Sequence, residues 1–159
     1  MQVAFSLKKK PPCIWPRNGS PTAEPLYNQA MSKTVIATAA APAAIGPYSQ
    51  AIRAGNLVFT AGQIALDPAT GQLVPGGIAE QTTQVLENLK AILEAAGTGL
   101  PKAVKATVFL RHFDDFADMN AVYGRYLSPP GVAPPARTTI EAARLPKDAL
   151  VEIDLVAEV

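Results

Sequence analysis

Residues 134–156 alternate apolar and polar positions with a period of two. This alternation predicts two β-strands joined by a turn at the Leu-Pro-Lys-Asp segment, where proline suits a position with a fixed φ and no N–H donor. On the first strand Arg137 and Thr139 share a face, and on the second strand Glu152 and Asp154 do. We expect one face of this sheet to be apolar and the other to gather an arginine, a hydroxyl and carboxylates.

Such a polar face suits two kinds of role. An arginine beside a hydroxyl and carboxylates could hold a small carboxylate and steer a water molecule next to it. A solvated sheet face with cross-strand ion pairs gives the same pattern and is the commoner case. The pattern alone leaves both interpretations open.

The remaining periodicities predict an α+β domain. Apolar residues recur at helical spacing in two segments, and four shorter segments alternate as strands do. With both helices on one face of a mixed sheet, the domain has two layers. The predicted helices cover 78–96 and 114–127, and the predicted strands cover 33–38, a hairpin over 50–64, and 104–111.

The sheet face opposite the helices is then uncovered. On it we place Arg137, Thr139, Glu152 and Asp154 together with Phe109. A free face that mixes apolar and ionic groups favours oligomerisation, in which symmetry-related sheets close against one another. Any pocket would then lie between subunits.

Composition narrows the class of protein. The chain has 159 residues, of which 48% are hydrophobic and 17% charged, as in a globular domain. No apolar run approaches the ~20 residues that a membrane helix needs. The single Cys13 excludes an intramolecular disulfide, and with one His112 a zinc site would have to rest on carboxylates, so we expect no metal-based catalysis.

Residues 1–30 differ from the rest of the chain. They hold five of the fifteen prolines and carry a charge of +3, which leaves −2 for residues 31–159 out of the total of +1. We expect a disordered extension or an upstream start before a domain that spans 31–159, and a cytoplasmic protein. A signal peptide does not fit, because no apolar h-region follows the basic run; an organelle transit peptide is the alternative. The acidic domain gives no electrostatic case for nucleic acid as a partner.

Several motifs, in this order along the chain, resemble the RidA (YjgF-like) reactive-intermediate deaminases. The resemblance covers residues 31–159 nearly end to end and leaves 1–30 unexplained. The motifs are IGPYSQA at 45–51, FTAGQI at 59–64, QVLENL at 84–89, VKATVFL at 104–110, and the segment from PAR at 135–137 to EI at 152–153.

The resemblance implies a chorismate-mutase-like fold and a homotrimer with three interfacial clefts. It also implies metal-free hydrolysis of 2-aminoacrylate or 2-iminobutyrate to a 2-oxoacid and ammonia. Pyridoxal-phosphate-dependent dehydratases release these intermediates, which damage other such enzymes if they persist. The expected ligands are therefore small 2-imino and 2-oxo acids, with neither nucleic acid nor membrane as a partner.

The resemblance also implies roles for individual residues. Arg137 takes the substrate carboxylate, which a planar guanidinium can grip in two hydrogen bonds. Glu152 positions or deprotonates water. Tyr48 lines the pocket, Gly62 makes a backbone contact, and Asn120 is a neighbouring polar residue; from the pattern alone, Tyr48 could equally be a packing residue and Asn120 a solvated one.

Two positions depart from a pattern common in the family. Ala61 stands where many members have serine, and Thr139 stands where many have cysteine. Threonine keeps a hydroxyl that can hold a water, so that change is mild. Ala61 removes a hydroxyl outright, and we expect Thr60 to face the other way along the strand, which makes it a poor substitute.

These residues imply a mechanism and leave two alternatives. Arg137 would hold the carboxylate of the imine while a water held by Thr139 and Glu152 attacks the electrophilic carbon. A non-catalytic trimer that senses 2-oxoacids in the same clefts would also keep Arg137, and Ala61 favours it. An RNA-directed role would have only the basic extension for phosphate contacts. The sequence does not decide between catalyst and sensor.

Overall fold

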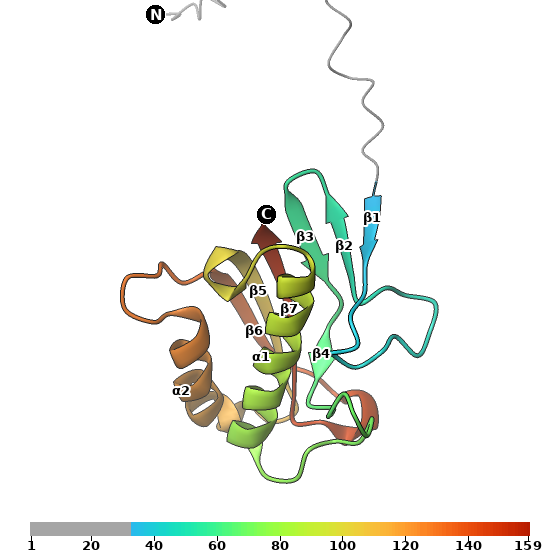
Figure 1. The fold of residues 1–159 in the computed structure, drawn as a ribbon. Coiled ribbons are helices and arrows are strands. Elements are labelled where there is room, and N and C mark those ends of the chain that lie inside the picture. Colours follow the sequence, from blue (N-terminus) through green and yellow to red (C-terminus); the bar gives the residue numbers. More distant parts are fainter. Residues whose placement is uncertain (1–32) are drawn as a thin grey trace, which may run out of the picture. The chain divides into compact units, whose positions relative to one another are not determined.

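The described part of the chain is residues 33–159 of a computed structural model, which forms a mixed β-sheet and two α-helices (Figure 1). The predicted extension, residues 1–30, lies outside the described residues. The strands are β1 (Lys33–Ile36), β2 (Ala51–Ala54), β3 (Leu57–Thr60), β4 (Gln63–Ile64), β5 (Ala103–Leu110), β6 (Ala136–Glu141) and β7 (Val151–Glu158). The helices are α1 (Ile78–Ala95) and α2 (Phe116–Leu127), and short 3-10 turns occupy Leu100–Lys102, Phe113–Asp115 and Pro146–Asp148.

The strands lie side by side in the order β1-β2-β3-β7-β5-β6, and β4 pairs with β7. All pairs are antiparallel except β5 with β6, which is parallel. The two strands predicted in residues 134–156 both exist, but they are not neighbours, because β5 lies between them. The turn at 145–148 therefore joins strands at different positions in the sheet.

Helix α1 forms where the apolar stripe predicts it. Its buried residues recur at helical spacing, and they pack against β7, β4 and β3. At its start the Glu80 carboxylate accepts a hydrogen bond of 2.8 Å from the Gly77 N–H, which satisfies a backbone donor that the helix leaves free. At its end Gly97 adopts a φ of +81°, a left-handed conformation that stops the helix.

Helix α2 follows a 3-10 turn and packs on α1, so both helices cover the same face of the sheet (Figure 1). This confirms the predicted two-layer α+β fold. The core lies between the layers and includes Met119 and Leu127 of α2, Val108 of β5 and Ile153 and Leu155 of β7. Within residues 33–159, neither helix combines the length and the apolar character needed to cross a membrane.

The opposite face of the sheet is open, but it does not carry the residues that the alternation predicted. In the register of β5, Val108 lies opposite Thr139 on one side and Ile153 on the other. Neighbouring residues in register point to the same face. Arg137 and Thr139 therefore lie on the helix-covered face, while Glu152 and Asp154 lie on the open face, as does Phe109. The prediction that one face gathers all four polar residues is wrong.

Candidate active site

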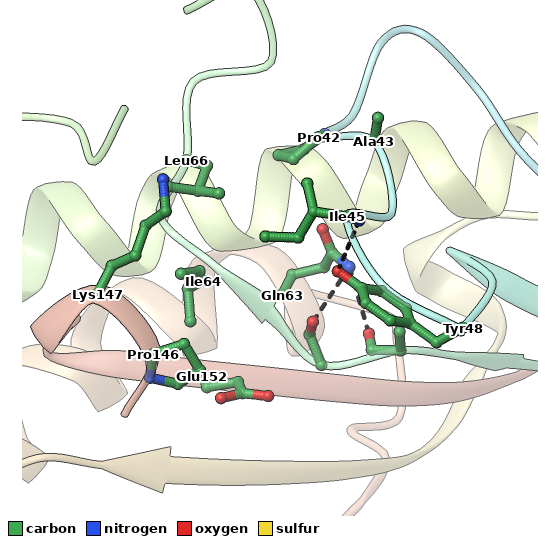
Figure 2. A pocket seen from close by; sticks show the side chains of 12 residues that line it. Pro42, Ala43, Ile45, Tyr48, Gln63, Ile64, Leu66, Pro146, Lys147 and Glu152 are labelled. Atoms are coloured by element: carbon green, nitrogen blue, oxygen red, sulfur yellow. Dashed lines mark hydrogen bonds between the residues drawn. The ribbon is translucent and has the colours of Figure 1, made fainter. Parts of the chain in front are cut away.

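A cavity of about 370 Å³ lies between the loop before β2, the β3–β4 connection and the turn before β7 (Figure 2). Four of the predicted site residues line it, namely Tyr48, Ala61, Gly62 and Glu152. Figure 2 shows Tyr48 and Lys147 on opposite sides of the pocket, with Glu152 below them in this view. The remaining walls are mostly apolar and include Pro42, Ile45, Ile64, Leu66 and Pro146.

Glu152 lies directly against the backbone of Gly62. A Cβ at position 62 would come within 2.9 Å of the Glu152 Cδ and still closer to its Oε1, distances that real side chains do not adopt. A glycine at the end of a strand often permits a close approach to the backbone, and here the approaching group is the Glu152 carboxylate. The strand is interrupted there, since β3 ends at Thr60 and β4 begins at Gln63.

Burial raises the pKa of Glu152, and the neighbouring charge of Asp154 raises it further. Both effects disfavour the ionised carboxylate, so Glu152 takes up a proton more readily than an ordinary glutamate. Burial also raises the pKa of Asp154, although a hydrogen bond with Thr107 and the charge of Lys105 partly offset this. A carboxylate with a raised pKa at a pocket wall is suited to exchange a proton with a bound molecule.

Tyr48 follows the Gly-Pro turn and presents its ring to the pocket. The side chain is 52% exposed, and its hydroxyl accepts a hydrogen bond of 3.4 Å from the Ile45 N–H. Tyr48 therefore lies in the pocket lining with about half of its side chain accessible.

Ala61 contributes a methyl group to the pocket wall and no hydrogen bond from its side chain. The neighbouring Thr60 does not replace the missing hydroxyl, because its Oγ1 accepts a hydrogen bond of 2.9 Å from the Leu155 N–H. This bond ties Thr60 to β7. The expectation that Thr60 is a poor substitute agrees with this arrangement.

The other predicted site residues form a second cluster, on the helix-covered face beside α2. Arg137 donates from Nη1 to the Asn120 Oδ1 at 2.8 Å. Its guanidinium carbon lies 4.5 Å from the centre of the Tyr123 ring and 5.5 Å from that of Phe116. Within residues 33–159, Arg137 forms no ion pair, so its charge is available to an anion.

Thr139 completes this second cluster. Its hydroxyl oxygen is buried and has no hydrogen-bond partner among the described residues, and the same holds for the Tyr123 hydroxyl. A buried hydroxyl without a partner destabilises a fold unless something else completes it. The Thr139 hydroxyl therefore has a hydrogen-bonding capacity that the described residues do not use.

Comparison with known proteins identifies the family. A family model described as Endoribonuclease L-PSP matches residues 38–159. The chain belongs to this family, the RidA (YjgF-like) family. A RutC family protein of Pyrococcus horikoshii is 57% identical over 125 residues, which are 79% of this chain and 97% of that protein. The 2-iminobutanoate/2-iminopropanoate deaminase of Escherichia coli is 50% identical over 127 residues, 80% of this chain and 98% of that protein.

The RidA fold is confirmed by solved structures as well. The crystal structure of TdcF from Escherichia coli with bound serine superimposes with a TM-score of 0.75 at 41% identity, and the match covers 79% of this chain and 98% of that one. The mixed sheet with two helices on one face is thus the chorismate-mutase-like arrangement of these relatives.

Within a single chain the RidA-type residues fall into two separate groups. Tyr48, Ala61, Gly62 and Glu152 line the pocket. Arg137, Thr139 and Asn120 lie beside α2, and β5 separates β6 from β7 by two strand spacings of roughly 4.8 Å each. Because the two groups also point to opposite faces of the sheet, one chain does not bring Arg137 next to Glu152.

Three residues of these two groups were missed by the sequence-based predictions. Phe116 and Tyr123 fall within the apolar stripe of the predicted helix at 114–127, and such residues are usually core; their spacing with Asn120, at i, i+4 and i+7, puts all three on one face of α2. Lys147 lies in a left-handed conformation with φ +55°, which carries its side chain to the pocket rim, where Nζ donates to the Gly71 carbonyl at 3.0 Å. No sequence signal indicated that backbone conformation for a lysine.

Proposed function

We propose that the protein is a hydrolytic deaminase that converts 2-aminoacrylate and 2-iminobutyrate to 2-oxoacids and ammonia. The observation that carries this proposal is the Glu152 carboxylate, seated against Gly62 in a mostly apolar pocket with a raised pKa. The identity of 50% to a protein named 2-iminobutanoate/2-iminopropanoate deaminase supports the same reaction. Pyridoxal-phosphate-dependent dehydratases would supply the substrates.

The working unit in this proposal is a homotrimer whose clefts lie between subunits. The pocket with Glu152 would come from one subunit, and the cluster with Arg137 and Thr139 from its neighbour. Two observations support this assembly: the two groups are separate within one chain, and the open sheet face exposes large apolar side chains. Val35, Phe59 and Ile140 are 60%, 44% and 45% exposed, and all three lie on the open face by register.

The proposed mechanism uses the side chains of both groups. After the enamine tautomerises to the imine, Arg137 holds the carboxylate in two hydrogen bonds. A water held between Thr139 and Glu152 forms a bond to the imine carbon and gives a proton to Glu152. Glu152 passes this proton to the nitrogen, which gives a carbinolamine. It then takes the proton of the new hydroxyl and delivers it to the nitrogen, so that the carbon–nitrogen bond breaks and ammonia leaves as the carbonyl forms. Positioning and electrostatics supply most of the rate enhancement.

The direct test generates 2-iminobutyrate in situ with a threonine dehydratase. We expect the protein to accelerate the release of 2-oxobutanoate in proportion to its concentration. Release that stays at the uncatalysed rate at every protein concentration would contradict the proposed activity.

A sensor of 2-oxoacids is the second candidate, and Ala61 is the observation that favours it. The pocket lacks a hydroxyl at this position, and the Thr60 hydroxyl is engaged with β7. A sensor would bind 2-oxobutanoate, as measured by calorimetry, and leave the release rate of the dehydratase assay unchanged. Binding together with turnover identifies the deaminase.

The family description also names an endoribonuclease, and the charge of the domain gives that role little support. Residues 31–159 carry a net charge of −2, whereas proteins that bind RNA through phosphate contacts present basic surfaces. We expect no cleavage of single-stranded RNA under conditions in which the deaminase assay shows turnover.

The assembly gives a prediction of its own. The protein should sediment at three times its chain mass, and Phe59→Glu should shift it towards monomer, because an unpaired charge in a closed apolar interface is unfavourable. Ala69→Glu, in the exposed loop between β4 and α1, is the matched control and should leave the mass unchanged. A wild-type monomer at micromolar concentration would contradict the interfacial site.

Gly62→Ala should lower kcat/KM for 2-iminobutyrate by about tenfold or more, because the new Cβ must displace the Glu152 carboxylate and small displacements of catalytic groups are costly. Gly124→Ala is the matched control, since a Cβ there meets no atom within 4 Å and the residue lies in α2. The control should keep full activity and gain stability. Equal activity of the two variants would show that the Gly62 contact has no catalytic role.

A further inference from the structure

The side chains that contact Arg137 come from one face of α2. Phe116, Asn120 and Tyr123 are spaced at i, i+4 and i+7, which aligns them along the helix. They offer the guanidinium two aromatic ring faces and one amide oxygen. These three residues form a contact surface on α2 for Arg137, which comes from the neighbouring edge strand β6. We call this surface the α2 arginine contact.

Tyr123 is the most rigid residue of the α2 arginine contact. It is only 4% exposed and belongs to the hydrophobic core, so close packing holds its ring plane. Asn120, by contrast, is exposed to solvent. The ring of Tyr123 is also the nearer of the two rings to the guanidinium, at 4.5 Å against 5.5 Å for Phe116.

The ring face makes the closest described contact with the guanidinium, at 4.5 Å from the ring centre. The Tyr123 hydroxyl is buried, and no hydrogen bond of normal geometry joins it to residues 33–159. Burial raises the pKa of Tyr123, and the charge of Arg137 together with a polar interaction between its side chain and the hydroxyl offsets part of that increase. The cation is therefore close enough to act electrostatically on the tyrosine.

We infer that Tyr123 is a positioning residue, which holds the Arg137 guanidinium in the plane from which it grips the substrate carboxylate. The N–H groups of a guanidinium lie in its own plane, so a fixed ring face at 4.5 Å from the guanidinium carbon limits the directions in which those N–H groups can point. Arg137 donates one N–H group, at Nη1, to the Asn120 Oδ1, and its other N–H groups can donate to a substrate carboxylate. The inference rests on the proposed function in that it assigns Arg137 to the substrate carboxylate.

The test compares Tyr123→Leu with Tyr123→Phe. Leucine removes the ring face, and we expect KM for 2-iminobutyrate and the dissociation constant of 2-oxobutanoate to rise about 5- to 30-fold, as for a desolvated cation–π contact. We expect kcat to change by less than about threefold, since the reacting groups are untouched. Phenylalanine keeps the ring face and should restore wild-type values, with a melting temperature that is equal or higher because it removes an unpaired buried hydroxyl.

Tyr126→Leu is the matched control on the same helix. Tyr126 hydrogen-bonds to Glu87 at 2.7 Å and does not contact Arg137, so its loss should change neither KM nor 2-oxobutanoate binding. In an Arg137→Lys background, Tyr123→Leu should cause no further loss of binding, because the two residues act as one unit. If Tyr123→Leu fails to fold, Tyr123→Met replaces it, since methionine fills the space without a ring face.

A readout without substrate separates this inference from the proposed reaction. The Arg137 Nε–H resonance should be displaced by the ring current of Tyr123, keep its position in Tyr123→Phe and move in Tyr123→Leu. An unmoved resonance, unchanged KM in Tyr123→Leu, or an equal loss in the Arg137→Lys background would overturn the inference. A protein that passes the resonance test and binds 2-oxobutanoate without turnover would contradict only the deaminase.

Discussion

Glu152→Gln should lower kcat for 2-iminobutyrate by roughly 10²- to 10⁴-fold, the range expected when a general base is lost. Glutamine keeps the shape of the side chain and its contact with Gly62, but it cannot take a proton from water. The dehydratase-coupled assay measures the loss. The folded assembly should survive, because the substitution removes a charge that burial disfavours.

The pH dependence follows from the direction of the same shift. Burial and Asp154 raise the pKa of Glu152, so its base form is lost on acidification at a higher pH than for an ordinary glutamate. The wild-type kcat should therefore fall on the acid side, and that limb should be absent in Glu152→Gln. For stability the sign is opposite to that of a salt-bridged acid. The unfavourable charge is fully present above the raised folded pKa, it is relieved as pH falls through that pKa, and the gain in stability is complete below the unfolded pKa.

Asp154→Asn is the matched control for both measurements. Asp154 shares the open sheet face with Glu152 but does not line the pocket. Removing its charge should lower the pKa of Glu152, so the acid limb should move to lower pH while the plateau of kcat stays within about threefold of wild type. Turnover of Glu152→Gln close to that of Asp154→Asn would show that Glu152 is not the base.

Local patterns predicted the elements well because their physical causes are local. The hairpin predicted over 50–64 forms between β2 and β3, with Gly55 at φ +62° in its turn. The helix predicted at 78–96 is α1, and the one predicted at 114–127 is α2 after a 3-10 turn at Phe113–Asp115. The hairpin and both helices are each stabilised largely by residues that lie close together in the sequence.

The face assignment of Arg137 and Thr139 was wrong because it depends on non-local pairing. Alternation shows which residues of one strand share a side, and it held within β6 and within β7. It does not relate the sides of two strands that never pair. That relation is set through β5, where Ala106 lies opposite both Arg137 and Leu155. Leu155 is in the core, so Arg137 lies on the core side as well.

The candidate site could be predicted from sequence only where a motif carries it. Tyr48, Gly62 and Glu152 came from the family resemblance, and the structure places all three around one pocket. Tyr123 escaped because an aromatic residue in a helical stripe is usually core, which it also is. The contact between Tyr123 and Arg137, on which its proposed positioning role depends, is set by tertiary structure, because it requires strand β6 to place Arg137 next to the ring.

Arg137→Lys should lower kcat/KM for 2-iminobutyrate about 30- to 150-fold and weaken 2-oxobutanoate binding to a similar extent. Lysine preserves the charge but loses the planar two-point grip, a charge-assisted contact worth about 2–3 kcal/mol. It also changes the contact with the Tyr123 ring, because a compact ammonium has no planar face to lie against the ring. The imine carbon would then sit off the line of water attack. The dehydratase-coupled assay and calorimetry measure the two effects.

Arg125→Lys is the matched control, since Arg125 lies in the last turn of α2 and contacts none of the proposed site residues by a hydrogen bond or ion pair within residues 33–159. If Arg137 were only a surface residue, its replacement should matter as little as that of Arg125, because either cation suits an exposed position, where ion pairs are worth about 0–1 kcal/mol. Sedimentation at three times the chain mass should hold for both variants. Near-normal turnover of an assembled Arg137→Lys protein would refute the assignment of Arg137 to the substrate carboxylate. It would also refute a role in the reaction for the α2 arginine contact.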